Sequence, residues 1–194
     1  HPFQLFNIID NCKFNNINQP NRNRLLRYDR SVDGVKTGYT KAAGYCLVAS
    51  SERDGMRLIS VVMGAGSDDA RVKESQKLLK YGFRNYETLE IYGPTETIKT
   101  SRIFFAEEDE IDLGVPAGVI VTIPRGQYKK LQAEMNIPKI LEAPIFQGEV
   151  VGELTLKISE EIIYRTSLVA MATLERTSFL GGLSDHFELL FMHE

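Results

Sequence analysis

The chain has 194 residues, of which 43% are hydrophobic, and carries a formal net charge of −3. This length allows one medium domain or two small ones, and the slightly acidic balance gives no reason to expect a nucleic-acid partner. No run of about 18 apolar residues is present, so no transmembrane helix is predicted.

Cysteine and histidine usage argues against a disulfide framework and against a metal site. The two cysteines, Cys12 and Cys46, are interpreted as small buried apolar side chains, with a bridge between them as the alternative. The three histidines, His1, His186 and His193, lie at the ends of the chain and lack ligand spacing. No metal or other cofactor is therefore expected.

The first part of the chain predicts a sheet with one packed helix. Residues 1–30 are rich in Asn and Arg and are predicted to be irregular. The segment around Lys36, bracketed by Gly34 and Gly38, is predicted to be a short strand that enters a sheet. Residues 43–52 and 56–65 are predicted to be two further strands joined by Asp54-Gly55, a strong hairpin signal. A helix over 68–87 follows. Either Ser67 or Asp68 can cap it, and its apolar face is expected to pack on the hairpin.

A change of composition at Tyr92-Gly93-Pro94 is interpreted as a linker, after which short strand signals alternate with turn residues. That spacing is typical of a small all-β sandwich. We therefore expect a domain portion over 1–91, an all-β domain over 92–177 and a terminal segment over 178–194. The strands expected in the second domain are 98–105, 119–123, 145–146, 150–158 and 162–172.

The terminal segment 178–194 places its large apolar side chains on one helical face. Such an amphipathic helix either docks on its own domain or lies in a membrane surface. Its charges do not favour the membrane, because no Lys or Arg follows Arg176.

The motif with most chemical content is Lys36-Thr37-Gly38. The Lys supplies a cation, the Thr supplies a hydroxyl that can donate and accept, and the Gly lets a ligand approach the strand closely. Such a strip suits a substrate that carries a carboxylate and an amide. Taken alone, three common residues are equally consistent with a solvated turn at a strand end.

The motif stands within a longer series of segments that resembles one family. Lys-Thr-Gly is one of three motifs of the β-lactamase and penicillin-binding protein family. The wider pattern is similar to the penicillin-binding protein 5 group of D-alanyl-D-alanine carboxypeptidases, and it covers the chain from about Asn15 onward. The segments that carry the resemblance include Gln19–Leu26, Val32–Gly34, Ala43–Tyr45, Leu47–Ser50, Met56–Ser60, Val62–Gly64, Gly82–Arg84, Leu113–Val115, Thr122–Gly126, Ala143–Pro144 and Val150–Gly152.

The resemblance implies a fold and a reaction. Residues 1–91 would be part of an α/β, transpeptidase-like domain in which an antiparallel sheet packs on a helix. A small all-β sandwich would follow, and then an amphipathic membrane anchor. The activity implied is a serine-type carboxypeptidase that removes the terminal D-alanine of peptidoglycan stem pentapeptides and is acylated by β-lactam antibiotics. The implied location is the periplasm, attached to the inner membrane.

The resemblance also assigns roles to particular residues. Lys36 would hold the substrate electrostatically, Thr37 would bind its terminal carboxylate, and Gly38 would keep the strand edge clear. The backbone N–H of Tyr39 would form half of an oxyanion hole. Further substrate-binding residues implied are Thr40, Arg71 and, near the cleft, Arg22.

The nucleophile of the family, in a Ser-x-x-Lys motif, does not occur among the eleven serines of the sequence, and no serine begins a Ser-x-Asn motif. We therefore expect this chain to be the carboxy-terminal portion of a longer protein and to be inactive alone. Two alternatives stay open, a non-catalytic module that docks on the envelope and a β-lactamase. The sequence does not indicate an oligomeric state.

Overall fold

The structure is a computed structural model that describes residues 11–14 and 16–177. Its contacts divide the chain into two compact units, His1–Thr88 and Leu89–Glu194. The predicted terminal helix over 178–194 lies outside the described residues. The two units are described separately below.

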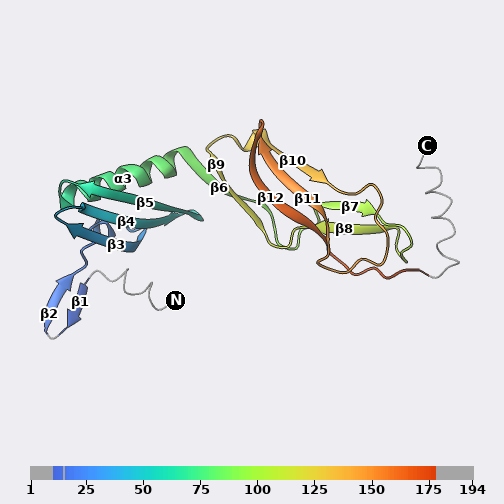
Figure 1. The fold of residues 1–194 in the computed structure, drawn as a ribbon, viewed down its shortest axis with the longest axis horizontal. Coiled ribbons are helices and arrows are strands. Elements are labelled where there is room, and N and C mark those ends of the chain that lie inside the picture. Colours follow the sequence, from blue (N-terminus) through green and yellow to red (C-terminus); the bar gives the residue numbers. More distant parts are fainter. Residues whose placement is uncertain (1–10, 15, 178–194) are drawn as a thin grey trace. The chain divides into compact units, whose positions relative to one another are not determined.

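The first unit is built on a three-stranded antiparallel sheet in the order β3-β4-β5 (Figure 1). A single long helix, α3, packs along one face of this sheet. A two-stranded hairpin and one short helical turn precede the sheet. The elements are β1 (Asn11–Phe14), β2 (Ile17–Pro20), α2 (Leu25–Tyr28), β3 (Val32–Thr40), β4 (Gly44–Arg53), β5 (Met56–Ala65) and α3 (Asp68–Asn85).

Local sequence signals explain the β4–β5 hairpin and the start of α3. Asp54 and Gly55 have φ angles of 48° and 76°, the left-handed pair that a tight two-residue turn requires. Arg53 and Met56 then face each other across the hairpin. Ser67 caps the helix by accepting a 3.1 Å hydrogen bond from the Ala70 N–H. The predicted hairpin and the Ser67 cap are confirmed.

The helix covers only one face of the sheet. Leu47 and Ala49 of β4 are buried together with Val72 and Leu79 of α3. Because side chains alternate along a strand, the intervening residues point to the opposite face. The sheet of the first unit therefore has a covered face and an open face.

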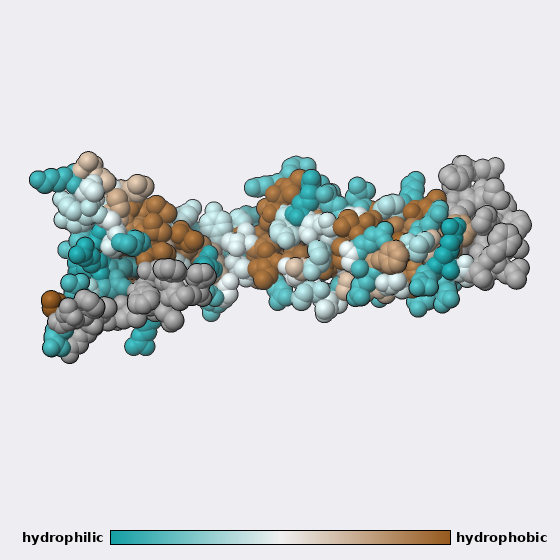
Figure 2. All heavy atoms as spheres, turned by 60° about the horizontal axis from the view of Figure 1, so that its bottom comes forward, coloured by the Kyte–Doolittle hydropathy of each residue, from teal (hydrophilic) through white to brown (hydrophobic). Residues whose placement is uncertain are grey.

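The open face carries exposed apolar side chains on β5. Ile59, Val61 and Met63 are 65%, 56% and 75% exposed. Val48 of β4 is paired with Val61 and is half-buried beside them. Figure 2 shows hydrophobic residues gathered on the surface of this unit. A row of three exposed apolar residues on one strand indicates a surface that another segment can cover.

The second unit is all-β over the residues that the structure describes, which end at residue 177. Five strands form an antiparallel sheet in the order β10-β11-β12-β8-β7, and β6 pairs with β9 in a second, two-stranded sheet. The long β11–β12 hairpin is its longest paired segment. The elements are β6 (Tyr86–Tyr92), β7 (Lys99–Arg102), β8 (Glu110–Gly114), β9 (Val119–Pro124), the 3₁₀ turn η1 (Tyr128–Lys130), β10 (Leu131–Asn136), β11 (Val150–Ile158) and β12 (Glu161–Ala170).

Two apolar clusters stabilise the second unit. One gathers Ile111 and Leu113 of β8 with Leu141 and Ile145 from irregular segments. The other gathers side chains of β9, β11 and β12, among them Val121, Leu154 and Leu168. The expected fold class, an antiparallel sheet with a packed helix followed by an all-β domain, is confirmed.

Several element predictions need correction. Residues 1–30 are not irregular throughout, since they contain β1, β2 and α2. The helix ends at Asn85 and not at residue 87, because Tyr86 begins β6. The predicted strand 98–105 is shortened to Lys99–Arg102, and residues 145–146 form only an isolated bridge between Ile145 and Leu174. Strands β6, β8 and β10 were not predicted.

A hydrogen-bonded cluster joins the loop before β3 to β4. Ser31 donates to Asp29 through its N–H at 3.0 Å and through its Oγ at 2.6 Å. Arg53 donates to the second Asp29 oxygen at 2.6 Å. Burial by itself raises the pKa of Asp29, but these hydrogen bonds from Ser31 and Arg53 outweigh it, and the pKa lies below its ordinary value of 3.8.

This cluster predicts acid sensitivity of the first unit. Because the pKa is depressed in the folded state, Asp29 stabilises the fold above pH 3.8, and that stabilisation is lost as the pH falls through the folded pKa. Asp29→Asn should lower the free energy of unfolding at neutral pH by about 2 kcal/mol. The free energy of unfolding of this variant should also fall less steeply than that of the wild type as the pH is lowered. Urea unfolding from about pH 7 to about pH 2, a range that extends below the ordinary pKa of 3.8, measures both. The exposed Asp54→Asn should change neither, and equal acid profiles for Asp29→Asn and wild type would rule this role out.

Candidate functional site

The Lys36-Thr37-Gly38 strip lies on β3 at the edge of the sheet. Among the described strands, β3 pairs only with β4, so its outer edge is unpaired. Lys36 is opposite Val48 and Thr37 is opposite Leu47. Alternation along the strand therefore places Lys36 on the open face of the sheet and Thr37 on the face covered by α3.

Lys36 is exposed and its ammonium is largely uncommitted. Nζ donates one hydrogen bond, of 2.9 Å, to the carbonyl oxygen of Thr37. It forms no ion pair with any residue in the described part of the chain. An ammonium has three donors, so two remain for a ligand beside the strand.

Gly38 is not required by the packing of the protein itself. A Cβ built at this position would meet only the Cβ of Cys46, at 3.8 Å, which is an ordinary contact. The backbone at Gly38 also lies outside the left-handed region. Space for an approaching backbone or ligand at the outer side of the strand is therefore the advantage that glycine brings here.

Tyr39 and Thr40 form the end of the strip. The ring of Tyr39 is 57% exposed and lies 4.4 Å from the ring of Tyr45 on β4. The Thr40 hydroxyl oxygen accepts a 2.9 Å hydrogen bond from the Ala43 N–H and so shapes the β3–β4 turn. A hollow of about 380 Å³ adjoins this end, lined by Tyr39, Lys41, Ala42, Ala43, Gly44, Tyr45, Gly64, Ala65 and Gly66.

Arg71 of α3 holds the strip in place through hydrogen bonds to the backbone of β3 and β4. It stands in the first turn of α3 and is only 5% exposed. Its Nη1 donates to the carbonyl oxygens of Gly38 at 3.1 Å and Cys46 at 3.0 Å, one on each strand. Nη2 pairs with Asp68, and the guanidinium lies 5.5 Å from the ring of Tyr45. Direct binding of a substrate carboxylate by Arg71 stays a prediction, since the structure turns the side chain toward the backbone of Gly38.

Arg22 is exposed, and its predicted place near the cleft stays a prediction. The next residue, Asn23, is the one that sequence reasoning missed. It is buried, and its Nδ2 donates to the Gly34 carbonyl oxygen at 3.1 Å, while its Oδ1 accepts from the Leu25 N–H. Its sequence signal was the helix-start pattern of an Asn just before the Leu25-Leu26 pair. Asn23 therefore holds the segment before α2 against the start of β3.

Within residues 11–14 and 16–177, no three or more His, Cys, Asp or Glu side chains are grouped so that they could hold a metal ion. Cys46 is a free thiol. No helix in this part of the chain is both long enough and apolar enough to cross a membrane. The chemistry of the site therefore rests on the Lys36 ammonium, the Thr37 hydroxyl and the open strand edge.

Two protein-family models match the chain in the order that these two units have. Residues 5–67 match the D-alanyl-D-alanine carboxypeptidase model, and residues 86–176 match the model of the penicillin-binding protein 5 C-terminal domain. The chain belongs to this carboxypeptidase family. Its β3 strip lies within the first match and its all-β unit corresponds to the second.

Individual relatives agree with this assignment. The chain is 44% identical over 183 residues to D-alanyl-D-alanine carboxypeptidase DacC of Escherichia coli K12. The aligned residues cover 93% of this chain and 46% of that protein. It is 40% identical to DacA of the same organism, with nearly the same coverage. Penicillin binding protein 5 from Haemophilus influenzae matches in structure with a TM-score of 0.81 and 36% identity, over 89% of this chain and 51% of that one. The chain thus spans about half the length of the relatives it matches.

Proposed function

We propose that the chain supplies the substrate-gripping strand of a serine-type D-Ala-D-Ala carboxypeptidase, an enzyme that removes the terminal D-alanine from peptidoglycan stem pentapeptides. One observation carries this proposal. The family's Lys-Thr-Gly motif lies on a strand edge that is unpaired among the described strands. The Lys36 ammonium is exposed on the open face with two donors unused, and buried Arg71 donates to the Gly38 carbonyl oxygen.

The strip can bind the end of a peptide by adding it to the sheet edge. An extended peptide pairs its main chain with an open strand. The ammonium of Lys36 lies on the open face, where it attracts the carboxylate end. We propose that the hydroxyl of Thr37, whose side chain lies on the other face, reaches the peptide across the unpaired edge of β3. Gly38 offers no side chain to obstruct the approach. Thr40 adds a second hydroxyl next to the strip. We propose that Arg71 and Arg22 supply further positive charge for binding the substrate carboxylate.

The reaction is then an acyl transfer. A serine Oγ attacks the carbonyl carbon of the D-Ala-D-Ala bond, and the negative charge that develops on the carbonyl oxygen is stabilised by two N–H groups. We assign one of these to the backbone of Tyr39 and the other to the serine. The C–N bond breaks, D-alanine leaves with a proton on its nitrogen, and water hydrolyses the ester. Penicillin would acylate the same serine, because attack on its β-lactam carbonyl breaks the ring C–N bond and leaves the opened penicillin as an ester.

The serine itself is proposed to come from a segment outside these 194 residues, since no Ser-x-x-Lys occurs in the sequence. The open face of the sheet supports this. Ile59, Val61 and Met63 are exposed on the face to which Lys36 points, so a segment that buried them would also be brought to the strip. We propose that the complete protein is periplasmic and attached to the inner membrane through residues 178–194.

Release of D-alanine by the complete protein, with the serine-bearing segment joined to this chain, tests the proposal. We expect release of the terminal alanine from a peptide ending in D-Ala-D-Ala and no release of alanine from the same peptide ending in L-Ala-L-Ala, because the strip fixes the orientation of the terminal carboxylate. A protein that instead turns over penicillin rapidly, without accumulating the acyl-enzyme, would be a β-lactamase. A protein that binds neither would be a docking module.

A further inference from the structure

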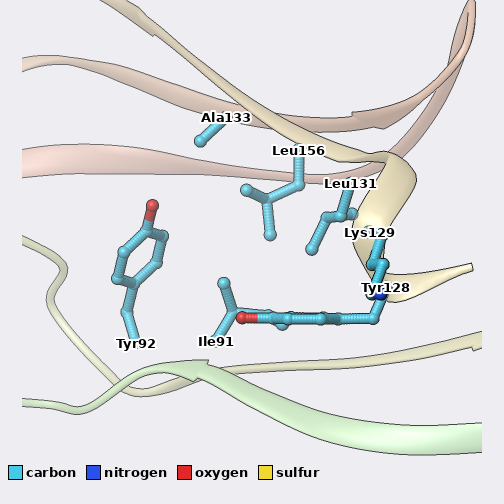
Figure 3. Close-up of a pocket in the computed structure, with 7 residues that line it drawn as sticks. All are labelled: Ile91, Tyr92, Tyr128, Lys129, Leu131, Ala133 and Leu156. Atoms are coloured by element: carbon cyan, nitrogen blue, oxygen red, sulfur yellow. The ribbon is translucent and has the colours of Figure 1, made fainter.

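A second hollow, distant in sequence from the β3 strip, lies in the all-β unit (Figure 3). Its volume is about 310 Å³, near the lower end of the range for small-molecule sites. Four elements of the same unit contribute to it, namely β6, η1, β10 and β11. Its lining residues are Ile91, Tyr92, Tyr128, Lys129, Leu131, Ala133 and Leu156.

The hollow combines an apolar floor with two tyrosines. Leu156 is fully buried beneath it, with Leu131 and Ile91 beside it. Tyr92 and Tyr128 lie on different sides of the hollow, and the hydroxyl of each borders it. Tyr128 is 58% exposed, and neither hydroxyl has a hydrogen-bond partner among the described residues. Aromatic rings with free hydroxyls above an apolar floor suit a ligand that is apolar on one face and polar at its edges.

The charged and polar groups that line the hollow restrict the class of ligand that it can bind. Lys129 is the only charged residue that lines the hollow, it is exposed, and it forms no ion pair in the described part of the chain. Burial, together with the neighbouring Glu96 and Tyr128, raises the pKa of Tyr92, so its hydroxyl stays protonated and can donate at neutral pH. The polar groups available are therefore one ammonium and two hydroxyls. They match a ligand that bears a carboxylate and several oxygen acceptors.

We propose that this hollow binds a carboxylate-bearing sugar ring of a glycan strand. The C–H face of the ring would lie on the floor and against Tyr128, its oxygens would meet the two tyrosyl hydroxyls, and its carboxylate would meet Lys129. A purely aromatic ligand would leave these hydroxyls unused. The choice of a peptidoglycan sugar rests on the proposed function, and the sugar bound here would be one that carries no stem peptide, because its carboxylate is free only when no peptide is joined to it.

The test is a binding titration that does not depend on peptidase activity. Methyl NMR signals of Leu131, Leu156 and Ala133 in the 194-residue chain are followed with two peptide-free disaccharides, N-acetylglucosaminyl-N-acetylmuramic acid and the uncharged chitobiose. We expect saturable shifts, with the acidic sugar binding about threefold tighter, the factor that an exposed ion pair provides. Lys129→Gln should remove that difference, and Tyr128→Ala should weaken both sugars about tenfold or more.

Two control variants distinguish a loss of binding at the hollow from an effect of mutation on the protein as a whole. Lys130→Gln changes an exposed neighbour that does not line the hollow, and Tyr81→Ala removes an exposed tyrosine of α3. Both should bind like the wild type. The proposal is overturned if neither sugar gives a saturable shift, if chitobiose binds as tightly as the acidic sugar, or if Tyr128→Ala binds unchanged. Because no D-Ala-D-Ala group is present, these outcomes are independent of whether the carboxypeptidase proposal holds.

Discussion

Replacing Lys36 by Ala in the complete protein should slow acylation by penicillin by about a thousandfold and leave the folded state unchanged. Loss of one preorganised charge or donor beside a developing negative charge typically has an effect of about a hundredfold to a thousandfold. The fold should tolerate the change, because Lys36 is exposed and its one hydrogen bond goes to the adjacent Thr37. Stopped-flow acylation and thermal unfolding, measured on the same preparation, separate the two effects.

Two further variants make the Lys36 result specific. Lys36→Arg retains the positive charge in a different shape and should recover part of the rate. Lys73→Ala removes an exposed lysine from α3 and should acylate like the wild type. If Lys36→Ala were acylated at the wild-type rate, the strip would not be the place where the substrate is held.

Replacing Arg71 by Met should destabilise the first unit by about 3–5 kcal/mol, the range for breaking a buried charged network. The variant keeps an apolar side chain of similar length but leaves the carbonyl oxygens of Gly38 and Cys46 without their donor. It also removes one of the two cationic partners of Asp68 in the first turn of α3, the other being Arg24. Urea unfolding followed by circular dichroism reports on α3, the longest helix described.

The same variant distinguishes a positioning role from a direct substrate contact. If Arg71 acts by holding Gly38, acylation by penicillin should slow in proportion to the loss of the folded strip, and stability should fall with it. The exposed Arg84→Met on the same helix should change neither. A variant as stable as the wild type that nevertheless acylates slowly would show that Arg71 contacts the substrate and does not position the strand.

Elements with local chemical signals were predictable from sequence. Asp54-Gly55 fixes a tight turn by itself, and Ser67 caps α3 with its own hydroxyl, so the β4–β5 hairpin and the helix start were predicted closely. Strand β10, with Gln132, Glu134 and Asn136, has no strand-like composition. It becomes a strand only because β11 supplies a hydrogen-bonding edge for it.

The candidate site likewise has a part that could be predicted from the sequence and parts that could not. The Lys36-Thr37-Gly38 motif is contiguous and was found by reading the chain. The clamp from Arg71 to Gly38 and Cys46 depends on how α3 packs on the sheet, and a bond to a carbonyl oxygen leaves no trace in the identity of the residue that accepts it. The hollow below Tyr92 and Tyr128 likewise depends on four elements meeting in space. Such sites become visible only when the fold is known.

Covalent labelling by fluorescent penicillin, compared between the 194-residue chain and the complete protein, tests the central claim most directly. That claim is that this chain grips the substrate while another segment provides the attacking serine. We predict one label per molecule of the complete protein, lost in its Lys36→Ala variant under brief exposure, and no label on the chain alone. A stable covalent label on the 194-residue chain would contradict the account, because the nucleophile would then lie within it.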